Sequence, residues 1–596
     1  MTSHTLDSIL AEGPFDYVVI GAGTAGLTLA ARLTEDPSVS VLVLEAGGDN
    51  INDADILRPV SYGVHLGNEA YSWSYNIVKQ QHSREAVWFR GKGLGGSSAI
   101  NFMCYTRAPA SDIDERLGNP GFNSERLTSC LQRARAEGSI SFPPNVTADI
   151  ELMFQQVLEK NGISAAPDPF GGDSNGYWLI PNNYDPATHT RSYSATAFYF
   201  PNRHRPNFKV LLYALATRLV TERGDDGMLV ATGVELMHDG KRKVVEAKRE
   251  VIVCAGALKS PQILEMSGIG GKQVLDRCNV PVLVDLPGVG RNTQDHVFIT
   301  QSYELVDGLP YQTADMLRDP EVAAEHIKLH SMGTGIHTSG MTGFCFTSPV
   351  KVSEKAHHIA LNNKKQILDQ WSSYSPDEQA QYKIFLDRID RGAPNCEFIL
   401  YQGLLPSGME LTNALQGDYC EFPCLSWLFT IKLTHVSKHS ISNDPTQDPE
   451  YDPKHLASDM DMLVEQAKFV RKLTSTSPLK DIIAREILPG PSVQSDSELK
   501  EFVKDTVGTM WHTASSCSMM PREIGGVVDS HYKVWFRAAV SYFSFIEVRR
   551  TQIYGTNNIR VADLSIIPIH FAAHPMAMVY AIAEHAAELI KEGRLV

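Results

Sequence analysis

The chain has 596 residues, more than the ~100–200 of one typical domain, and 43% of them are hydrophobic, enough to form large buried cores. Its formal net charge of −15 and the lack of a dense Lys/Arg block argue against a nucleic-acid surface. No apolar run approaches the ~18 residues that would span a bilayer, and residues 1–13 do not resemble a secretory signal, so we expect a cytoplasmic protein. The nine cysteines are scattered, which favours reduced, buried thiols, and we expect no metal site.

Residues 14–48 predict a strand–helix–strand unit that binds a dinucleotide. Residues 15–20 and 39–44 are apolar runs typical of buried strands, and residues 24–33, rich in Ala and Leu, predict a helix between them. Gly21, Gly23 and Gly26 follow G-x-G-x-x-G spacing, which permits a tight turn and close approach of a pyrophosphate to the helix N-terminus. Glu45 ends the second strand, where its carboxylate can accept hydrogen bonds from both ribose hydroxyls. The acid argues against a 2′-phosphorylated cofactor but does not separate FAD from NAD.

Residues 90–101, rich in glycine and serine, predict a second loop that a large ligand approaches closely. The alternative is a flexible linker. Trp88 and Phe89 stand before the glycine-rich part of the loop, and Ile100 and Phe102 stand after it. A linker would not be bracketed by core residues. We therefore favour a cofactor contact.

Further strands are expected at 208–212, 229–236 and 250–254. A helix is then predicted with Ser260 as its N-cap, Pro261 in its first turn and Gly268 as its stop. Residues 300–500 mix strand-like runs, such as 424–433, with polar helices, such as 375–389 and 459–473, and predict a separate lobe. Near the C-terminus, His512 adjoins a loop of small residues, and His574-Pro575 opens a helix with proline at its first position.

Taken in chain order, these sequence segments resemble the glucose–methanol–choline (GMC) oxidoreductases, a family of FAD flavoproteins. The resemblance extends over almost the whole length of the chain. The resemblance rests on the first glycine turn with Glu45, on residues 91–101, 256–270 and 289–296, and on the two C-terminal histidines. It implies an α/β fold in which a Rossmann-like FAD-binding domain is combined with a discontinuous substrate-binding domain built on an antiparallel sheet. The FAD-binding parts are expected at 14–115, 205–300 and 501–596, and the substrate lobe at 116–204 and 301–500.

The resemblance also implies roles for single residues. His512 is expected to be the catalytic base, and His574 the second hydrogen-bond partner of the alkoxide. Residues expected to bind FAD are Gly21, Gly23, Thr24, Ala25 and Gly26 at the pyrophosphate, Glu45 and Ala46 at the ribose, Gly95 in the second loop, Asn101, Phe102, Met103 and Cys104 along the isoalloxazine, Ala216 at the adenine, and Asp563 and Pro575 near the pyrimidine end.

The implied activity is oxidation of a small-molecule alcohol, with hydride transfer to flavin N5 and oxygen or another compound as electron acceptor. Imidazole suits the proton transfer, because its ordinary pKa of ~6.5 lets it accept a proton near neutral pH. The chain resembles GMC enzymes of fungal secondary-metabolite pathways. Two alternatives stay open: a flavin-binding protein that has lost activity, and hydroxynitrile-lyase-like chemistry in which FAD is structural.

Residues 534–552 interrupt the resemblance, since joining residue 533 to residue 553 restores the short turn and strand of the family. Every valine codon begins with GT and a glutamine codon can be CAG, so Val534 and Gln552 stand where the donor and acceptor of a short intron could lie. The segment is rich in aromatic residues and would be an aggregation hazard if exposed. Our hypothesis is a translated, unspliced intron; the alternative is a surface hairpin or a partner-docking loop.

Overall fold

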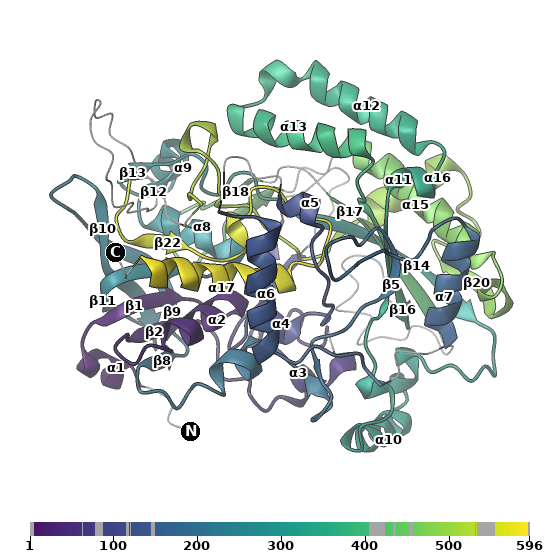
Figure 1. Cartoon of the computed structure of the whole chain (residues 1–596), viewed down its shortest axis with the longest axis horizontal. Coiled ribbons are helices and arrows are strands. Elements are labelled where there is room, and N and C mark those ends of the chain that lie inside the picture. The colour runs from purple at the N-terminus through teal and green to yellow at the C-terminus, as the bar shows by residue number, and fades with distance from the viewer. Residues whose placement is uncertain are drawn as a thin grey trace.

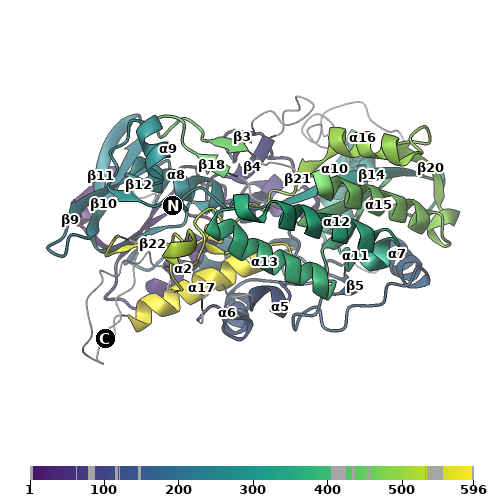
Figure 2. The same cartoon turned by 90° about the horizontal axis from the view of Figure 1, so that it is seen from above.

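A computed structural model describes residues 5–593 except 62, 78–86, 115–118, 120, 145–148, 405–423, 433–436, 453–456, 531 and 533–554. Its elements form two lobes that lie side by side, each around a seven-stranded sheet (Figure 1; Figure 2). The segment 534–552 lies outside the described residues.

The sheet of the first lobe combines a parallel half with an antiparallel half. Its order is β8 (Phe208–Leu211), β2 (Val41–Leu44), β1 (Phe15–Ile20), β11 (Lys241–Val253), β10 (Leu229–His238) and β9 (Leu215–Arg223). The first four strands are parallel, and β22 (Ile559–Val561) pairs in parallel with the end of β11. β1 and β2 are buried along their whole length, as expected for strands covered on both faces.

Helices from distant parts of the chain cover this sheet. α2 (Thr24–Leu33) and α17 (Met576–Glu592) bury most of their residues and pack against each other, and α6 (Ser124–Glu137) packs on α17 (Figure 1). α8 (Gly256–Met266) contacts β9. The remaining short helices of this lobe are α1 (Leu6–Glu12), α3 (Ala54–Leu57), α4 (Ser97–Ile100), α5 (Ala110–Ile113) and α9 (Lys272–Arg277). The N- and C-terminal motifs thus share one hydrophobic core.

The second lobe is built on an antiparallel sheet. Its order is β20 (Ile483–Leu488), β14 (His296–Leu305), β17 (Cys424–Lys432), β16 (Cys396–Gln402), β15 (Gly343–Thr347) and β5 (Gly176–Leu179), with β21 (Gly508–Thr509) against β14. Its helices are α7 (Asp149–Lys160), α10 (Pro320–Ser331), α11 (Pro349–Val352), α12 (Ala356–Asp369), α13 (Pro376–Arg391), α15 (Ala457–Thr474) and α16 (Asp496–Thr506). The lobe with an antiparallel sheet expected from the sequence is present.

Four two-stranded sheets account for the remaining strands of the described residues. They are β3 (Ser72–Asn76) with β4 (Val87–Gly91), β6 (Tyr184–Asp185) with β7 (Thr190–Arg191), β12 (Ile269–Gly270) with β13 (Val284–Asp285), and β18 (Ser437–His439) with β19 (Glu450–Asp452).

The predicted start of α8 is wrong. The helix begins at Gly256, so Pro261 lies inside it and Ser260 is no N-cap. Its first amide is satisfied from outside, because Asp563 Oδ2 accepts a hydrogen bond from Gly256 N at 2.8 Å. Pro261 lacks the N–H that would bond to the Ala257 carbonyl, and Ser516 Oγ donates to that carbonyl instead at 2.6 Å. These distant partners explain why a proline is tolerated in the helix interior.

The segment 116–204, expected to be one part of the substrate lobe, contributes to both cores. α6 and residues 193–198 pack in the core of the first lobe, whereas α7 packs in the core of the second. α6 belongs to the first lobe because its apolar face, including Leu127 and Leu131, is covered by α17.

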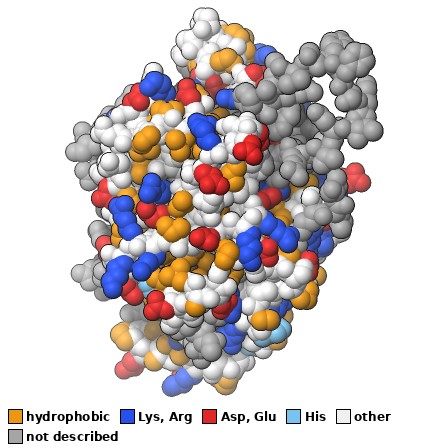
Figure 3. Space-filling model, turned by 90° about the vertical axis from the view of Figure 1, so that its left-hand side faces the viewer, with side chains coloured by type: hydrophobic (Ala, Val, Ile, Leu, Met, Phe, Trp, Pro, Cys, Tyr) orange, Lys and Arg blue, Asp and Glu red, His pale blue; other side chains and the backbone are white. Residues whose placement is uncertain are grey.

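The surface carries charges of both signs. Figure 3 shows acidic and basic side chains intermingled on the side that lies to the left in Figure 1. Among the helices of the described residues, none has the length and apolar character needed to cross a membrane.

Candidate active site

One long cavity runs between the two lobes and is lined by residues from both ends of the chain. Its wall includes Glu45, Ala46 and residues 214–217, the glycine turn at Gly21 and residues 23–25, and residues 96–98. Residues 100–104, His512 and His574 line it as well, and the part around the two histidines is referred to as its catalytic end. The cavity therefore brings together motifs that are hundreds of residues apart.

The glycine turn after β1 lies on the wall of this cavity. Gly21 has φ +104°, and a Cβ there would lie 2.5 Å from the Cys254 carbonyl oxygen. Gly23 is the N-cap of α2 and offers no side-chain cap, so the first amides of the helix are left for a ligand. A Cβ at Gly96 would lie 2.8 Å from Gly23 Cα, so the two glycine loops meet backbone to backbone. This uncapped helix N-terminus on the cavity wall fits the pyrophosphate of FAD.

Glu45 has a structural role that the sequence did not predict: it bonds to the backbone of three separate segments. Its Oε2 accepts a hydrogen bond from Ala22 N at 2.9 Å, and its Oε1 accepts from Gly47 N at 2.8 Å and Gly93 N at 2.9 Å. The carboxylate thus joins the first glycine turn, the end of β2 and the second loop. Burial raises the pKa of Glu45, while these amides oppose the shift. A carboxylate has about four lone-pair positions, so about one stays available for a ribose hydroxyl.

Two expected cofactor residues lie behind the cavity wall. A Cβ at Gly26 would meet the Gly21 carbonyl oxygen at 1.9 Å, so this glycine allows α2 to pack against β1. A Cβ at Gly95 would lie 2.4 Å from the Tyr193 ring, and Gly95 N donates to Ala22 O at 2.9 Å. Both glycines shape the wall, whereas the other expected cofactor residues line the cavity: Gly21, Gly23, Thr24, Ala25, Glu45, Ala46, Asn101, Phe102, Met103, Cys104, Ala216, Asp563 and Pro575.

The two predicted catalytic histidines lie together at the end of the cavity. The ring centroids of His512 and His574 are 4.7 Å apart. Burial, with His574, His570 and Arg90 nearby, lowers the pKa of His512 well below its ordinary value. His512 is therefore an unprotonated imidazole at neutral pH, able to accept a proton.

His574 is held by a carboxylate from the second lobe. Its Nε2 lies 2.9 Å from Oε1 of Glu397, which is only 2% exposed. Because a carboxylate only accepts, Nε2 of His574 carries the proton. Sequence reasoning missed Glu397, although a charged residue within the apolar run of β16 is a signal that could have found it.

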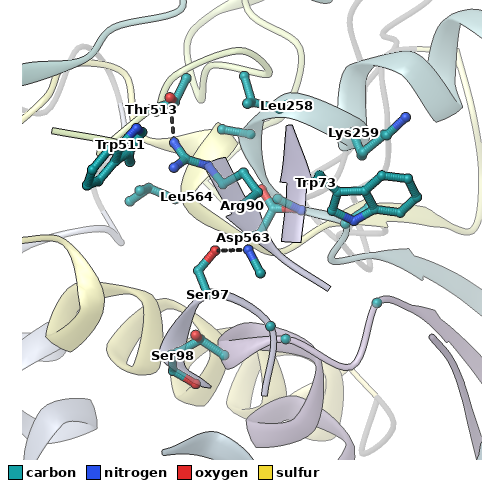
Figure 4. A pocket seen from close by; sticks show the side chains of 18 of the residues that line it. Trp73, Arg90, Ser97, Ser98, Leu258, Lys259, Trp511, Thr513, Asp563 and Leu564 are labelled. Atoms are coloured by element: carbon teal, nitrogen blue, oxygen red, sulfur yellow. Dashed lines mark hydrogen bonds between the residues drawn. The ribbon is translucent and has the colours of Figure 1, made fainter. Parts of the chain in front are cut away.

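Arg90 and Lys259 bring positive charge to the cavity wall. Arg90 Nη2 donates to Thr513 Oγ1 at 2.5 Å, and Lys259 Nζ lies 4.8 Å from the centroid of the Trp73 ring. Figure 4 shows Arg90 reaching toward Thr513, with Trp73 and Lys259 on the opposite side. Their charge is complementary to that of a pyrophosphate. Neither residue was singled out from the sequence.

Comparison with known proteins identifies the family of the chain. The family model described as GMC oxidoreductase matches residues 15–298 with its N-terminal part and residues 435–538 with its C-terminal part. A dehydrogenase named mpl7 from Monascus purpureus is 30% identical and covers 98% of this chain and 96% of its own. An oxygen-dependent choline dehydrogenase from Pseudomonas syringae is also 30% identical, covering 97% of this chain and 94% of its own.

Solved structures show the same fold. An FAD-dependent oxidoreductase from Chaetomium thermophilum has a TM-score of 0.83 at 25% identity, covering 98% of this chain and 100% of its own. A fungal aryl-alcohol oxidase has a TM-score of 0.79 at 25% identity, with the same coverage. The chain therefore belongs to the GMC oxidoreductase family, whose members use FAD to oxidise CH–OH groups.

Proposed function

We propose that His512 removes the hydroxyl proton of an alcohol while the alcohol carbon is oxidised, with His574 as the second partner of the substrate oxygen. The observation that carries this proposal is the pair of imidazoles at the end of the cavity, 4.7 Å apart. When bound, FAD supplies the acceptor for the hydride at flavin N5. Gly21, residues 23–25, Glu45 and residues 101–104 would hold it there.

The unprotonated state of His512 supports its role as base. A base needs a free lone pair, and burial, which lowers the pKa of His512, favours the neutral ring that has one. His570 Nε2 lies 2.7 Å from the His512 carbonyl oxygen, and Asp295 Oδ1 accepts from His512 N at 2.8 Å. The backbone of the base is thus fixed on both sides.

The second histidine has a different task. Its Nε2–H is committed to Glu397, so His574 is oriented by the substrate lobe while its backbone N donates to Thr106 Oγ1 at 2.8 Å. The neutral ring then offers Nδ1 only as an acceptor, so beside His512 it can orient the alcohol O–H before the proton leaves. We expect His574 to contribute less than His512, because His or Asn can fill such a role.

The cavity beyond the histidines favours a substrate with a flat, apolar body. The rings of Phe102 and Trp511 are stacked with centroids 6.3 Å apart and 14° between planes, and Phe298 lies edge-on to Trp511. Met341 and Ile399 complete this part of the wall. Aromatic side chains favour stacked or edge-on ring partners. We infer an alcohol on an aromatic or polyketide-like intermediate of a cytoplasmic fungal secondary-metabolite pathway, and the fungal dehydrogenases among the relatives support this placement.

The test is anaerobic reduction of the FAD-loaded protein by a panel of aryl, polyketide-like and amino alcohols. We expect one class to bleach the flavin absorbance. His512→Ala should retain FAD and lose at least ~10²-fold in the reduction rate, and His574→Ala should lose less. His357→Ala, at an exposed position of α12, is the matched control and should reduce at the wild-type rate.

Each negative result has a distinct meaning. No bleaching by any alcohol, with an intact flavin spectrum, would favour a protein without redox activity. Cleavage of a hydroxynitrile without bleaching would favour the lyase alternative. An unchanged rate in His512→Ala would exclude this residue as the base.

A further inference from the structure

Two buried imidazoles, His296 and His570, lie against His512 and are not among the residues that line the cavity. His296 begins β14, and His570 precedes the loop that carries His574. The Nδ1 atoms of His296 and His512 are 2.9 Å apart, and the ring centroids of His296 and His570 are 4.0 Å apart. The base is therefore in direct contact with a second imidazole.

The proton of His570 is fixed by backbone groups. Its Nε2 lies 2.7 Å from the His512 carbonyl oxygen, which only accepts, so Nε2 carries the proton. Its Nδ1 lies 2.9 Å from Phe571 N, whose N–H donates to it. Burial lowers the pKa of His570 to about 4. His570 is thus a neutral ring with both nitrogens committed to the backbone.

The contact between His296 and His512 has two possible arrangements. Two imidazole nitrogens at hydrogen-bond distance share one proton, so one Nδ1 donates and the other accepts. If His296 donates, neutral His512 carries its proton on Nε2 and cannot accept another there. If His512 donates, its Nε2 has a free lone pair. Only the second arrangement provides a base whose Nε2 serves the cavity.

Asp295 aligns the backbones of the two rings. Its Oδ1 accepts from the backbone N of both His296 and His512, each at 2.8 Å. Its Oδ2 accepts from Thr509 Oγ1 at 2.5 Å and Thr513 Oγ1 at 3.2 Å, so the carboxylate is committed to these partners. Buried Asp295 therefore holds the backbones of His296 and His512 in the positions that bring their Nδ1 atoms together.

We propose that His296 is the positioning residue of His512: its Nδ1 accepts the Nδ1–H of His512 and holds that ring with Nε2 available to the substrate. This inference rests on the proposed function in so far as His512 is the base. The hydrogen bond persists when His512 takes the alcohol proton on Nε2, because its Nδ1–H is present in both forms. His296 thus has the place that a carboxylate holds in a Ser-His-Asp triad.

A neutral acceptor has a chemical consequence. A carboxylate at this position would stabilise the imidazolium more strongly, because hydrogen bonds between charged partners are stronger. The groups facing the two rings are His570, His574, Arg90, Asp295 and, behind His574, Glu397. Burial is the main cause that lowers the pKa of both His296 and His512. The arrangement orients the base and keeps it unprotonated.

The test uses a matched pair of variants, His296→Asn and His296→Leu. Asn Oδ1 stands at the position of His Nδ1 and can accept, whereas Leu has a similar size and no acceptor. The first measurement is nitrogen NMR of the FAD-loaded, ¹⁵N-histidine-labelled protein, with the His512 signals assigned by their loss in His512→Gln. We expect the Nδ1–H form of His512 in the wild type and in His296→Asn, and a mixture of both tautomers in His296→Leu.

The second measurement is anaerobic flavin reduction by the alcohol that reduces the wild type fastest. We expect a loss of at least ~10²-fold in His296→Leu, as for a misplaced catalytic group, and a rate restored to within ~10-fold of wild type in His296→Asn. An Nε2–H form of His512 in the wild type would overturn the proposal. So would a Leu variant with the wild-type tautomer and rate.

The two proposals fail in different ways. If no alcohol bleaches the wild-type flavin, the proposed function fails, while the tautomer measured by NMR still decides the role of His296. If His296→Leu does not fold, the wild-type tautomer and the rate of His296→Asn decide it. A rate in His296→Asn as low as in His512→Ala would then count against the proposal.

Discussion

Replacing Glu45 by glutamine tests whether one buried carboxylate supports the cofactor end of the cavity. In the wild type, its two oxygens accept three backbone hydrogen bonds of 2.8–2.9 Å, from Ala22, Gly47 and Gly93. Glutamine has one acceptor oxygen and one amide that only donates. If that oxygen takes the place of Oε1 toward Gly47 and Gly93, the amide faces Ala22 N–H, donor against donor.

The expected loss of stability follows from these three hydrogen bonds. A hydrogen bond to a charged group contributes about 1.5–3 kcal/mol, and a neutral one about 0.5–1.5 kcal/mol. Glu45→Gln loses one charged bond and weakens two others to neutral ones. These losses sum to about 3.5–6 kcal/mol, and removal of the buried charge offsets part of them, so we expect the free energy of unfolding to fall by about 3–5 kcal/mol. The affinity for FAD should fall at least ~10-fold, equivalent to about 1.4 kcal/mol, because the glycine turn and the second loop are no longer tied together. Glu45→Arg should strip most of the flavin from the protein.

The assay measures both quantities on the same preparations. Unfolding is followed by denaturant titration, and FAD affinity by titrating the flavin into deflavinated protein. Asp16→Asn is the matched control, because Asp16 Oδ2 also accepts a backbone hydrogen bond, from Ser40 N at 2.8 Å, but does not line the cavity. We expect this control to lose some stability and to bind FAD like the wild type.

Two results would refute the reasoning. If Glu45→Gln and Asp16→Asn had the same FAD affinity, Glu45 would be an ordinary structural carboxylate. If Glu45→Gln unfolded at the wild-type denaturant concentration, the three hydrogen bonds would not contribute as argued.

Four further predictions concern the catalytic end, the second lobe and the segment 534–552. Glu397→Gln should slow anaerobic flavin reduction by about 10-fold, less than His512→Ala, because His574 keeps a weaker acceptor; an unchanged rate would contradict the coupling. Since burial lowers the pKa of His512, the rate of flavin reduction should stay constant between about pH 6 and 8. A fall in this rate toward acid pH with a midpoint near ~6.5 would argue against the lowered pKa. Burial raises the pKa of Glu151 to about 8, so folding favours its protonated form. The free energy of unfolding of the wild type should therefore fall as pH rises from about 4.3 to 8. Glu151→Gln should remove this fall, which denaturant titration at several pH values would measure. Deleting 534–552 should raise soluble yield and keep activity; loss of activity on deletion, with transcripts that retain the segment, would contradict the intron hypothesis.

The sequence alone determined the parts of this protein that depend on local pattern. The strand–helix–strand unit could be predicted because apolar runs and glycine spacing encode it within a few dozen residues, and α2 has the predicted bounds Thr24–Leu33. The turn at Gly21 needs a positive φ and a close backbone approach that glycine provides, so its place was readable as well. The family resemblance added the order of the lobes and the two histidines.

Tertiary structure decided what depends on partners distant in sequence. The start of α8 was mispredicted because its first amide is capped by Asp563, and the carbonyl left free by Pro261 is satisfied by Ser516. Glu397 and His296 reach the catalytic end only because β16 and β14 place them against the C-terminal loops. Hydrogen bonds between side chains hundreds of residues apart leave no periodic signal in the chain, since their geometry exists only once both lobes have packed.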